Sequence, residues 1–298
     1  MVTPPYLKPG DSIGITSTAR KITKGELSFF LKMVSDWGLN PVLGATIDAQ
    51  QDQFAGDDAL RTAEFQKFLD DPEIKAIWCA RGGYGTVRII DALDFTKFKK
   101  NPKWIVGYSD VTVLHSHIHR FGIETLHANM PSEMGKKSEA TRTSVKQVLF
   151  GEDYSVAYSN PSSLNRQGSA SGVLVGGNLS ILYSLTGSPS ALTTEGKVLF
   201  IEDLDEYLYH IDRMMQNLKR NNMLEGLAGL IVGGFSDMHD NKIPFGQSAP
   251  EIVHDIVKEY DYPVSFNFPA GHINDNRAII LGREVELIVT QNKTTVNF

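Results

Sequence analysis

The stretch whose residue types are best suited to catalysis is Trp-Ile-Val-Gly-Tyr-Ser-Asp-Val-Thr-Val-Leu at 104–114. An apolar strand runs into a tight turn, and a helix is expected to begin directly after Ser109. A hydroxyl in this strand–turn–helix context stands at a helix N-terminus, where the helix dipole and unpaired N–H groups favour negative charge. Ser109 is therefore a candidate nucleophile, and the Asp110 N–H is a candidate donor to an oxyanion.

The same stretch has a simpler explanation, because Ser109 or Asp110 would also serve as an ordinary helix cap. The match to the Gly-x-Ser-x-Gly elbow of hydrolases is partial, since Val111 replaces the second glycine. The segment by itself leaves both interpretations open.

A second candidate is the loop Arg-Gly-Gly-Tyr-Gly at 81–85, which follows an apolar run. Its glycines permit positive φ and close approach of a ligand to the backbone, so the loop suits a phosphate or part of an oxyanion hole. The Walker and Gly-x-Gly-x-x-Gly patterns are both missing, which makes a nucleotide site a weak interpretation. A plain turn is the alternative. Cys79, just before the loop, is expected to be a small buried apolar residue.

Candidates for an acid and a base lie in the second half of the chain. Glu202 is the first carboxylate after the apolar run 198–201, and strand ends facing a crevice often carry functional groups. His272 lies in a glycine-flanked loop between two predicted strands. The order serine, glutamate, histidine is the order found in many α/β hydrolases. The competing carboxylates near Glu202 are Asp203, Asp205 and Glu206.

The remaining histidines offer alternatives. His115, His117 and His119 form a His-x-His-x-His run that invites a metal interpretation. On a helix, His115 and His119 share a face while His117 points elsewhere, and two ligands make a poor zinc site. We therefore expect no metal. His127 is a rival for the role of the base.

The elements that must position these residues follow from the apolar periodicity. The first half alternates strand-like and helix-like segments, which predicts a parallel sheet covered by helices. Predicted strands lie at 12–16, 41–43, 74–80 and 104–107, and predicted helices at 23–37, 57–69, 87–93 and 110–120. In the second half, predicted strands lie at 172–175, 197–201, 228–232 and 263–268, with a helix at 208–218 and two final strands from 277 joined at Gly282.

A polar segment at 159–171 interrupts the alternation and is the predicted linker. It divides the chain into an N-terminal α/β domain at 1–158, which carries the nucleophile, and a β-rich domain at 172–298, which carries the acid and the base. The fold class predicted is α/β, with the active site between the two lobes.

Composition limits the partners and the compartment. The chain has 298 residues, 41% of them apolar and 21% charged, with a net charge of −6, as in ordinary globular proteins. Basic residues do not cluster, so we expect no nucleic-acid partner. No apolar run reaches the roughly 20 residues of a membrane helix. One cysteine and no signal-peptide pattern favour a cytoplasmic location.

Taken in order, these segments resemble the LD-carboxypeptidase (muramoyltetrapeptide carboxypeptidase) family of serine peptidases. Each block is weak alone, but the ordered set is specific and spans nearly the whole chain. The blocks are Gly-Asp at 10–11 through Ser-Thr-Ala at 17–19, 81–85, Gly-Tyr-Ser-Asp at 107–110, Gly-Gly-Asn-Leu-Ser at 176–180, Ile-Glu-Asp at 201–203 with Arg213, and Gly-His at 271–272.

The resemblance implies Ser109 as nucleophile, His272 as general base and Glu202 as the acid that orients it. It implies an oxyanion hole made of backbone N–H groups, here those of Asp110 and Gly83, and no cofactor. The implied activity is removal of D-alanine from a murein tetrapeptide, by cleavage of the bond from the L-centre of a diamino acid. A homodimer is also implied.

Substrate contacts are less certain from the sequence. We expect an arginine to bind the substrate carboxylate, because a guanidinium fork suits that group, and Arg81 is the first choice. Tyr84 and His127 are further candidates. Ala-Asn at 128–129 departs from the Gly-Pro associated with the family, which leaves the local contacts open.

Three alternatives accompany the murein peptidase interpretation. The nearest is a microcin C-type immunity peptidase of the same family, which cleaves an amide joining an amino acid to an adenylate analogue. The compact segment between Ser109 and Glu202 favours the murein enzyme over it. The others are a non-catalytic peptide- or sugar-binding protein and a nucleotide-binding protein that uses the glycine loop.

Overall fold

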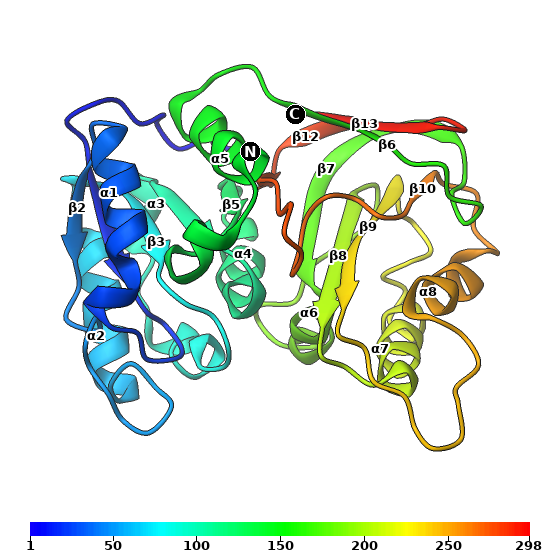
Figure 1. Cartoon of the computed structure of the whole chain (residues 1–298), viewed down its shortest axis with the longest axis horizontal. Coiled ribbons are helices and arrows are strands. Elements are labelled where there is room, and N and C mark those ends of the chain that lie inside the picture. The colour runs from blue at the N-terminus through cyan, green and yellow to red at the C-terminus, as the bar shows by residue number, and fades with distance from the viewer.

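The N-terminal half folds around a six-stranded sheet with the strand order β11-β5-β4-β3-β1-β2, and Figure 1 shows its strands β2 and β3 among the blue and cyan elements. The computed structural model describes all 298 residues. Strands β1 to β5 are parallel, and β11 joins β5 antiparallel at the edge. The bounds are β1 Ser12–Thr16, β2 Asn40–Leu43, β3 Ile74–Cys79, β4 Trp104–Gly107, β5 Thr125–His127 and β11 Ile279–Leu281.

Helices cover both faces of this sheet, as a parallel sheet requires. Neighbouring strand residues point to opposite sides, so that Trp78 packs in one apolar cluster while Ile77 packs in another. The first cluster includes residues of α1 and α5, and the second includes residues of α2, α3 and α4. The helices are α1 Ser28–Asp36, α2 Asp58–Asp70, α3 Thr96–Lys100, α4 Thr112–His119 and α5 Glu139–Phe150.

The second sheet has seven strands in the order β10-β9-β8-β7-β12-β13-β6. Strands β7 to β10 are parallel, and β12, β13 and β6 add an antiparallel extension. The helices α6, α7 and α8 pack on one face (Figure 1). The bounds are β6 Ser155–Ser159, β7 Gly168–Asn178, α6 Leu179–Leu185, β8 Val198–Leu204, α7 Leu208–Arg220, β9 Gly229–Ser236, α8 Ala249–Val257, β10 Val264–Ser265, β12 Glu284–Val289 and β13 Lys293–Asn297.

The predicted fold class is confirmed: the chain is an α/β protein with a mostly parallel N-terminal sheet and a mixed C-terminal sheet. None of its helices combines the length and the apolar character needed to cross a bilayer.

Several local predictions were wrong in extent; the strand predicted at 172–175, for example, is part of the 11-residue β7, whose first residues were predicted as linker. The helix predicted at 23–37 is a 3-10 turn, Lys24–Leu27, followed by α1, and a Thr23–Glu26 capping box holds the turn. The helix predicted at 87–93 is a pair of 3-10 turns, Thr86–Arg88 and Ile90–Ala92. The strand predicted at 263–268 ends at Ser265, since Asn267 has a left-handed φ of 57° that a strand does not accommodate.

The chain passes between the two sheets more than once. Strand β6, which precedes the predicted linker, pairs with β13 in the second sheet, and β11, late in the chain, pairs with β5 in the first. A fourth apolar cluster contains Phe200 of β8 together with Ile279 and Leu281 of β11, so the two sheets share a core. The domain boundaries at 158 and 172 stay a prediction.

Candidate active site

Ser109 occupies a strained turn at the end of β4. Its φ is +62°, a left-handed conformation that costs a serine free energy, and a 3-10 turn at Ser109–Val111 leads directly into α4. No side chain caps this N-terminus, so no side-chain acceptor takes up its first N–H groups. The predicted strand–turn–helix context is present, with the strain that marks a nucleophile elbow.

The partial elbow motif has a steric explanation. A Cβ at Gly107 would lie 2.8 Å from a methyl group of Val111, so valine takes the space that a side chain at 107 would need. The His115 Nε2 also donates to the Gly107 carbonyl at 2.9 Å, which fixes the strand end. Of the two glycines in the elbow motif, the one that this chain requires is therefore Gly107, before the serine.

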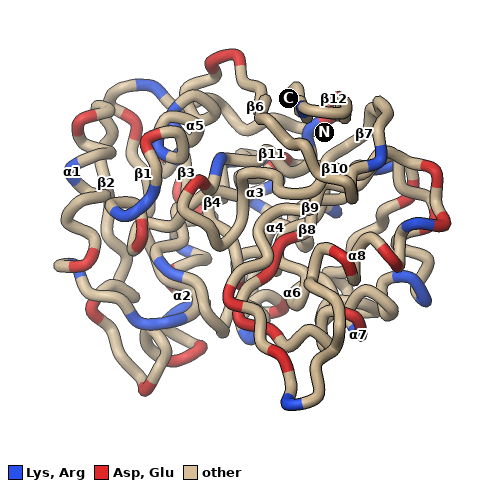
Figure 2. The backbone as a smooth tube through the Cα atoms, turned by 45° about the vertical axis from the view of Figure 1, so that its right-hand side comes forward, with Lys and Arg blue, Asp and Glu red and all other residues tan.

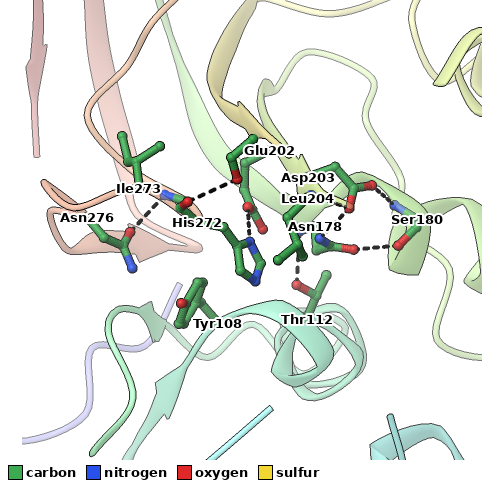
Figure 3. Close-up of polar contacts among 12 residues, drawn as sticks. Tyr108, Thr112, Asn178, Ser180, Glu202, Asp203, Leu204, His272, Ile273 and Asn276 are labelled. Carbon is green, nitrogen blue, oxygen red and sulfur yellow. Dashed lines mark hydrogen bonds and ion pairs between the residues drawn. The ribbon is translucent and has the colours of Figure 1, made fainter. Parts of the chain in front are cut away.

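His272 and Glu202 form a buried ion pair at the end of β8, drawn in Figure 3. The His272 Nδ1 and the Glu202 Oε2 are 2.6 Å apart, and the Glu202 side chain is fully buried. Gly271 makes this approach possible: its φ is +106°, and a Cβ there would meet the Glu202 Cβ at 2.8 Å. The Gly271 N–H donates to the Asn276 side chain at 2.8 Å, which holds the loop.

The pair shifts the pKa of both groups. Burial alone lowers the pKa of His272, but the charge of Glu202 and its hydrogen bond outweigh burial and raise that pKa above the ordinary value of 6.5. For Glu202, burial acts to raise the pKa, and the partner imidazole brings it below its usual value. Glu202 is therefore a carboxylate that accepts the Nδ1–H of His272, which leaves Nε2 free to take a proton.

Ser109 and His272 line the same cavity, which has a volume of about 360 Å³. Asp110, Gly82 and Gly83 line it as well, and a Cβ at Gly82 would lie only 3.3 Å from the Ser109 Cβ. The glycine loop after β3 thus lies against the elbow after β4, because β3 and β4 are neighbours in the sheet. The Ser109 hydroxyl makes no hydrogen bond within the chain.

A polar network at the end of β7 joins the two halves beside this cavity (Figure 3). The Asn178 N–H donates to the Thr112 hydroxyl at 3.1 Å, and its side-chain amide donates to Asp203 at 2.9 Å. The Ser180 N–H donates to the other oxygen of Asp203 at 2.8 Å. Burial, with the neighbouring charge of Glu202, raises the pKa of Asp203 to about 7. Asp203 thus faces away from His272 and braces the fold, while Glu202 contacts the imidazole.

Tyr108 is a site residue that sequence reasoning missed. Its ring centroid is 4.6 Å from that of His272, and its hydroxyl donates to Glu133 at 2.7 Å. The side chain is almost wholly buried and lines the cavity. Its position directly before Ser109 could have indicated a place at the site, because the residue next to an elbow serine lies at the same strand end.

Two of the predicted substrate contacts are not brought to the cavity. His127 is fully buried in β5, neither ring nitrogen has a hydrogen-bond partner, and burial lowers its pKa to about 3. It therefore stays neutral beneath the site. Tyr84 is exposed, and its ring lies 6.3 Å from that of Phe54. Arg81 does line the cavity, but it is paired with Glu26 at 3.2 Å.

The three histidines of the His-x-His-x-His run have separate partners. His115 contacts Thr125 and Gly107, His117 contacts Ser190, and the Lys197 ammonium donates to His119. No group of three or more His, Cys, Asp or Glu side chains is arranged around a common point. Cys79 is fully buried, as predicted, and burial raises its thiol pKa to about 12.

Both halves of the chain match descriptions of one family. Residues 13–128 match the LD-carboxypeptidase N-terminal domain, and residues 171–287 match the LD-carboxypeptidase C-terminal domain. The family resemblance inferred from the motifs is confirmed by these matches.

Individual relatives agree in length as well as in sequence. A probable murein peptide carboxypeptidase of Bacillus subtilis is 35% identical over 98% of this chain and 93% of its own. The microcin C7 self-immunity protein of Escherichia coli is 25% identical over 93% of this chain and 90% of its own. The crystal structure of a muramoyltetrapeptide carboxypeptidase from Oxalobacter formigenes superposes with a TM-score of 0.87, at 25% identity, over 96% of this chain and 97% of that one.

Proposed function

Because the chain belongs to the LD-carboxypeptidase family, we propose that it is a serine carboxypeptidase that removes D-alanine from murein tetrapeptides. Ser109 is the nucleophile, His272 the general base and Glu202 the acid that orients it. The observation that carries the proposal is the Glu202–His272 pair, 2.6 Å apart, on a cavity shared with the strained Ser109. A binding protein has no need of either feature.

The first half of the reaction forms an acyl-enzyme. The Ser109 Oγ attacks the carbonyl carbon between the L-centre of the diamino acid and D-alanine, while the free Nε2 of His272 takes the hydroxyl proton. The Glu202 carboxylate stabilises the imidazolium that results. Serine–histidine bonds are often long in a free enzyme and tighten with substrate, consistent with an unbonded Ser109 here.

The tetrahedral intermediate places a negative charge on the former carbonyl oxygen. The Asp110 N–H, at the uncapped helix start, and the Gly83 N–H, in the adjacent loop, are the donors we assign to that oxygen. The intermediate collapses when the C–N bond breaks, and His272 gives its proton to the leaving D-alanine amine. Water, deprotonated by His272, then attacks the ester and releases the tripeptide and Ser109.

Three further predictions accompany this activity. Hydrolysis of murein tetrapeptides serves peptidoglycan recycling, and the single cysteine, Cys79, agrees with a cytoplasmic enzyme. A homodimer is expected from the family.

The direct test is incubation of the purified protein with free tetrapeptides, one containing diaminopimelate and one containing lysine, followed by mass spectrometry. Release of D-alanine and the matching tripeptide is the expected result. A protein that leaves both peptides intact, while keeping its thermal unfolding transition, would refute the proposed activity.

The microcin-type activity is the second candidate, because the Escherichia coli self-immunity protein matches nearly the whole chain. An adenylate substrate favours an aromatic surface on which the base can stack. The one aromatic ring on this cavity, Tyr108, is buried against His272. The cavity therefore favours a peptide, and a parallel assay with an aminoacyl sulfamoyl adenosine decides between the two: faster cleavage of that compound would reverse the assignment.

A further inference from the structure

Two arginines line the cavity, and the structure separates their roles. The Arg81 guanidinium is 3.2 Å from Glu26 and donates to the Lys21 carbonyl at 3.4 Å, so its charge is already compensated. The Arg20 guanidinium forms no ion pair and no hydrogen bond within the chain. Of the two cationic groups on the cavity wall, Arg20 is the one whose charge is not paired with a carboxylate of the chain.

The backbone of Arg20 is fixed by the adjacent loop. Its N–H donates to the Gly82 carbonyl at 3.4 Å, and its carbonyl accepts a hydrogen bond from the Ser17 hydroxyl at 2.6 Å. Arg20 follows β1 and Gly82 follows β3, and these strands are neighbours in the sheet. The side chain therefore starts from a defined point beside the glycine loop.

The stem of Arg20 lies directly over Gly83. A Cβ at Gly83 would meet the Arg20 Cδ at 2.5 Å and its Nε at 2.6 Å, so a side chain at position 83 would displace the arginine from this place. The preceding Gly82 lies against Ser109, as described above. The Arg20 side chain therefore lies against the glycine loop, whose Gly83 N–H is assigned to the oxyanion, and lines the same cavity as Ser109.

The charge of the remaining wall reinforces this placement. Apart from Tyr108 and His272, the other ionisable groups along the cavity are carboxyl groups, and Figure 2 shows acidic positions along the loop that follows β8. They belong to Asp110, whose carboxylate accepts the Thr86 N–H, and to Glu133, Asp203, Asp205 and Glu206. A substrate carboxylate is repelled from that side and attracted to the arginine side.

We propose that Arg20, and not Arg81, binds the free α-carboxylate of the residue that is released. This inference rests on the proposed function, since it identifies the carboxylate as that of the terminal D-alanine. A guanidinium donates two parallel hydrogen bonds to a carboxylate, which fixes the distance between the chain end and the scissile bond. Arg20 would thereby restrict cleavage to the last peptide bond.

The test compares tetrapeptide acid with its C-terminal amide, using wild type, Arg20→Gln and Arg81→Gln. Wild type is expected to prefer the acid in kcat/KM, and Arg20→Gln to reduce that preference about 10- to 100-fold, the value of a hydrogen-bonded charge. Arg81→Gln should retain the preference, which makes it the matched control. Loss of the preference in Arg81→Gln but not in Arg20→Gln would overturn the inference.

A binding measurement separates this inference from the proposed function. Calorimetric titration of Ser109→Ala, with and without Arg20→Gln, uses the same acid and amide and needs no turnover. Acid-selective binding that disappears with Arg20→Gln supports the carboxylate site even if wild type cleaves nothing. Turnover without any acid preference would retain the peptidase and refute the role of Arg20, and absence of both turnover and binding would refute both.

Discussion

On the N-terminal side of the cavity Ser109 is held by backbone conformation, whereas on the C-terminal side His272 is held by charge. Ser109 has a φ of +62° and no hydrogen bond on its hydroxyl. His272 is 2.6 Å from a fully buried Glu202. Backbone strain in a turn therefore characterises one half of the site, and a buried pair of side chains characterises the other.

The difference predicts how each half responds to change. Strain at Ser109 comes from the main chain, so a new side chain there alters the chemistry and leaves the turn in place. The two side chains of the buried pair depend on each other, because removing the charge of one partner leaves the other buried without compensation. Substitutions on the C-terminal side should therefore change the pH dependence as well as the rate.

The largest effect is expected for Ser109→Ala. Loss of the nucleophile should lower kcat on the murein tetrapeptide by about 10⁴- to 10⁶-fold, as for other members of a catalytic triad. The thermal unfolding midpoint should stay at the wild-type value, because Ser109 Oγ has no partner to lose. Turnover at the wild-type rate would remove Ser109 from the mechanism.

The next effect is expected for Glu202→Gln, which keeps the shape and removes the charge. By comparison with triads in which the acid is replaced by its amide, kcat should fall about 10³- to 10⁴-fold. Only the neutral imidazole is active, so wild-type activity should fall as the pH drops through the His272 pKa, which lies above 6.5.

In Glu202→Gln that pKa should fall, because burial is no longer opposed by a carboxylate, and the acid limb of the kcat/KM profile should move to lower pH. Glu206→Gln is the matched control, since Glu206 pairs with His210 at 2.6 Å outside the proposed triad. An acid limb that stays in place in Glu202→Gln would contradict the assigned base.

The smallest effect is expected from a comparison of stabilities that tests the backbone strain at Ser109 alone. Ser109→Gly and Ser109→Ala both lack the nucleophile, but only glycine adopts positive φ without cost. Ser109→Gly is therefore expected to be more stable than Ser109→Ala by about 1 kcal/mol in urea unfolding. Equal stabilities would show that the turn relaxes and stores no strain.

The local features of both halves of the site could be predicted from the sequence. The bounds predicted for β1 and β4 match those observed, and the apolar run before Glu202 ends where the acid is needed. Apolar strands with a turn signal at one end are defined by nearest neighbours in the chain. The same local segments left Ser109 and His272 open, and the resemblance to a family, carried by the ordered set of motifs, implied the triad with Glu202.

The features of the site that could not be predicted from the sequence depend on which strands lie side by side. Arg20 lies in the loop after β1, and nothing near it in the chain indicates that β3 and its glycine loop lie next to it. Arg81, which is inside that loop, was the natural choice by sequence and is the one paired with Glu26. His127 was a candidate for a similar reason, since burial cannot be read from a three-residue strand.

Strand β11 has a consequence for how the enzyme handles substrate. The loop that carries His272 is anchored before it by β10 in the second sheet and after it by β11 in the first. A movement that separated the two sheets would break the pairing of β11 with β5, so we expect the cavity to keep its shape when a ligand enters. A C-terminal half produced alone would expose the apolar side chains of β11.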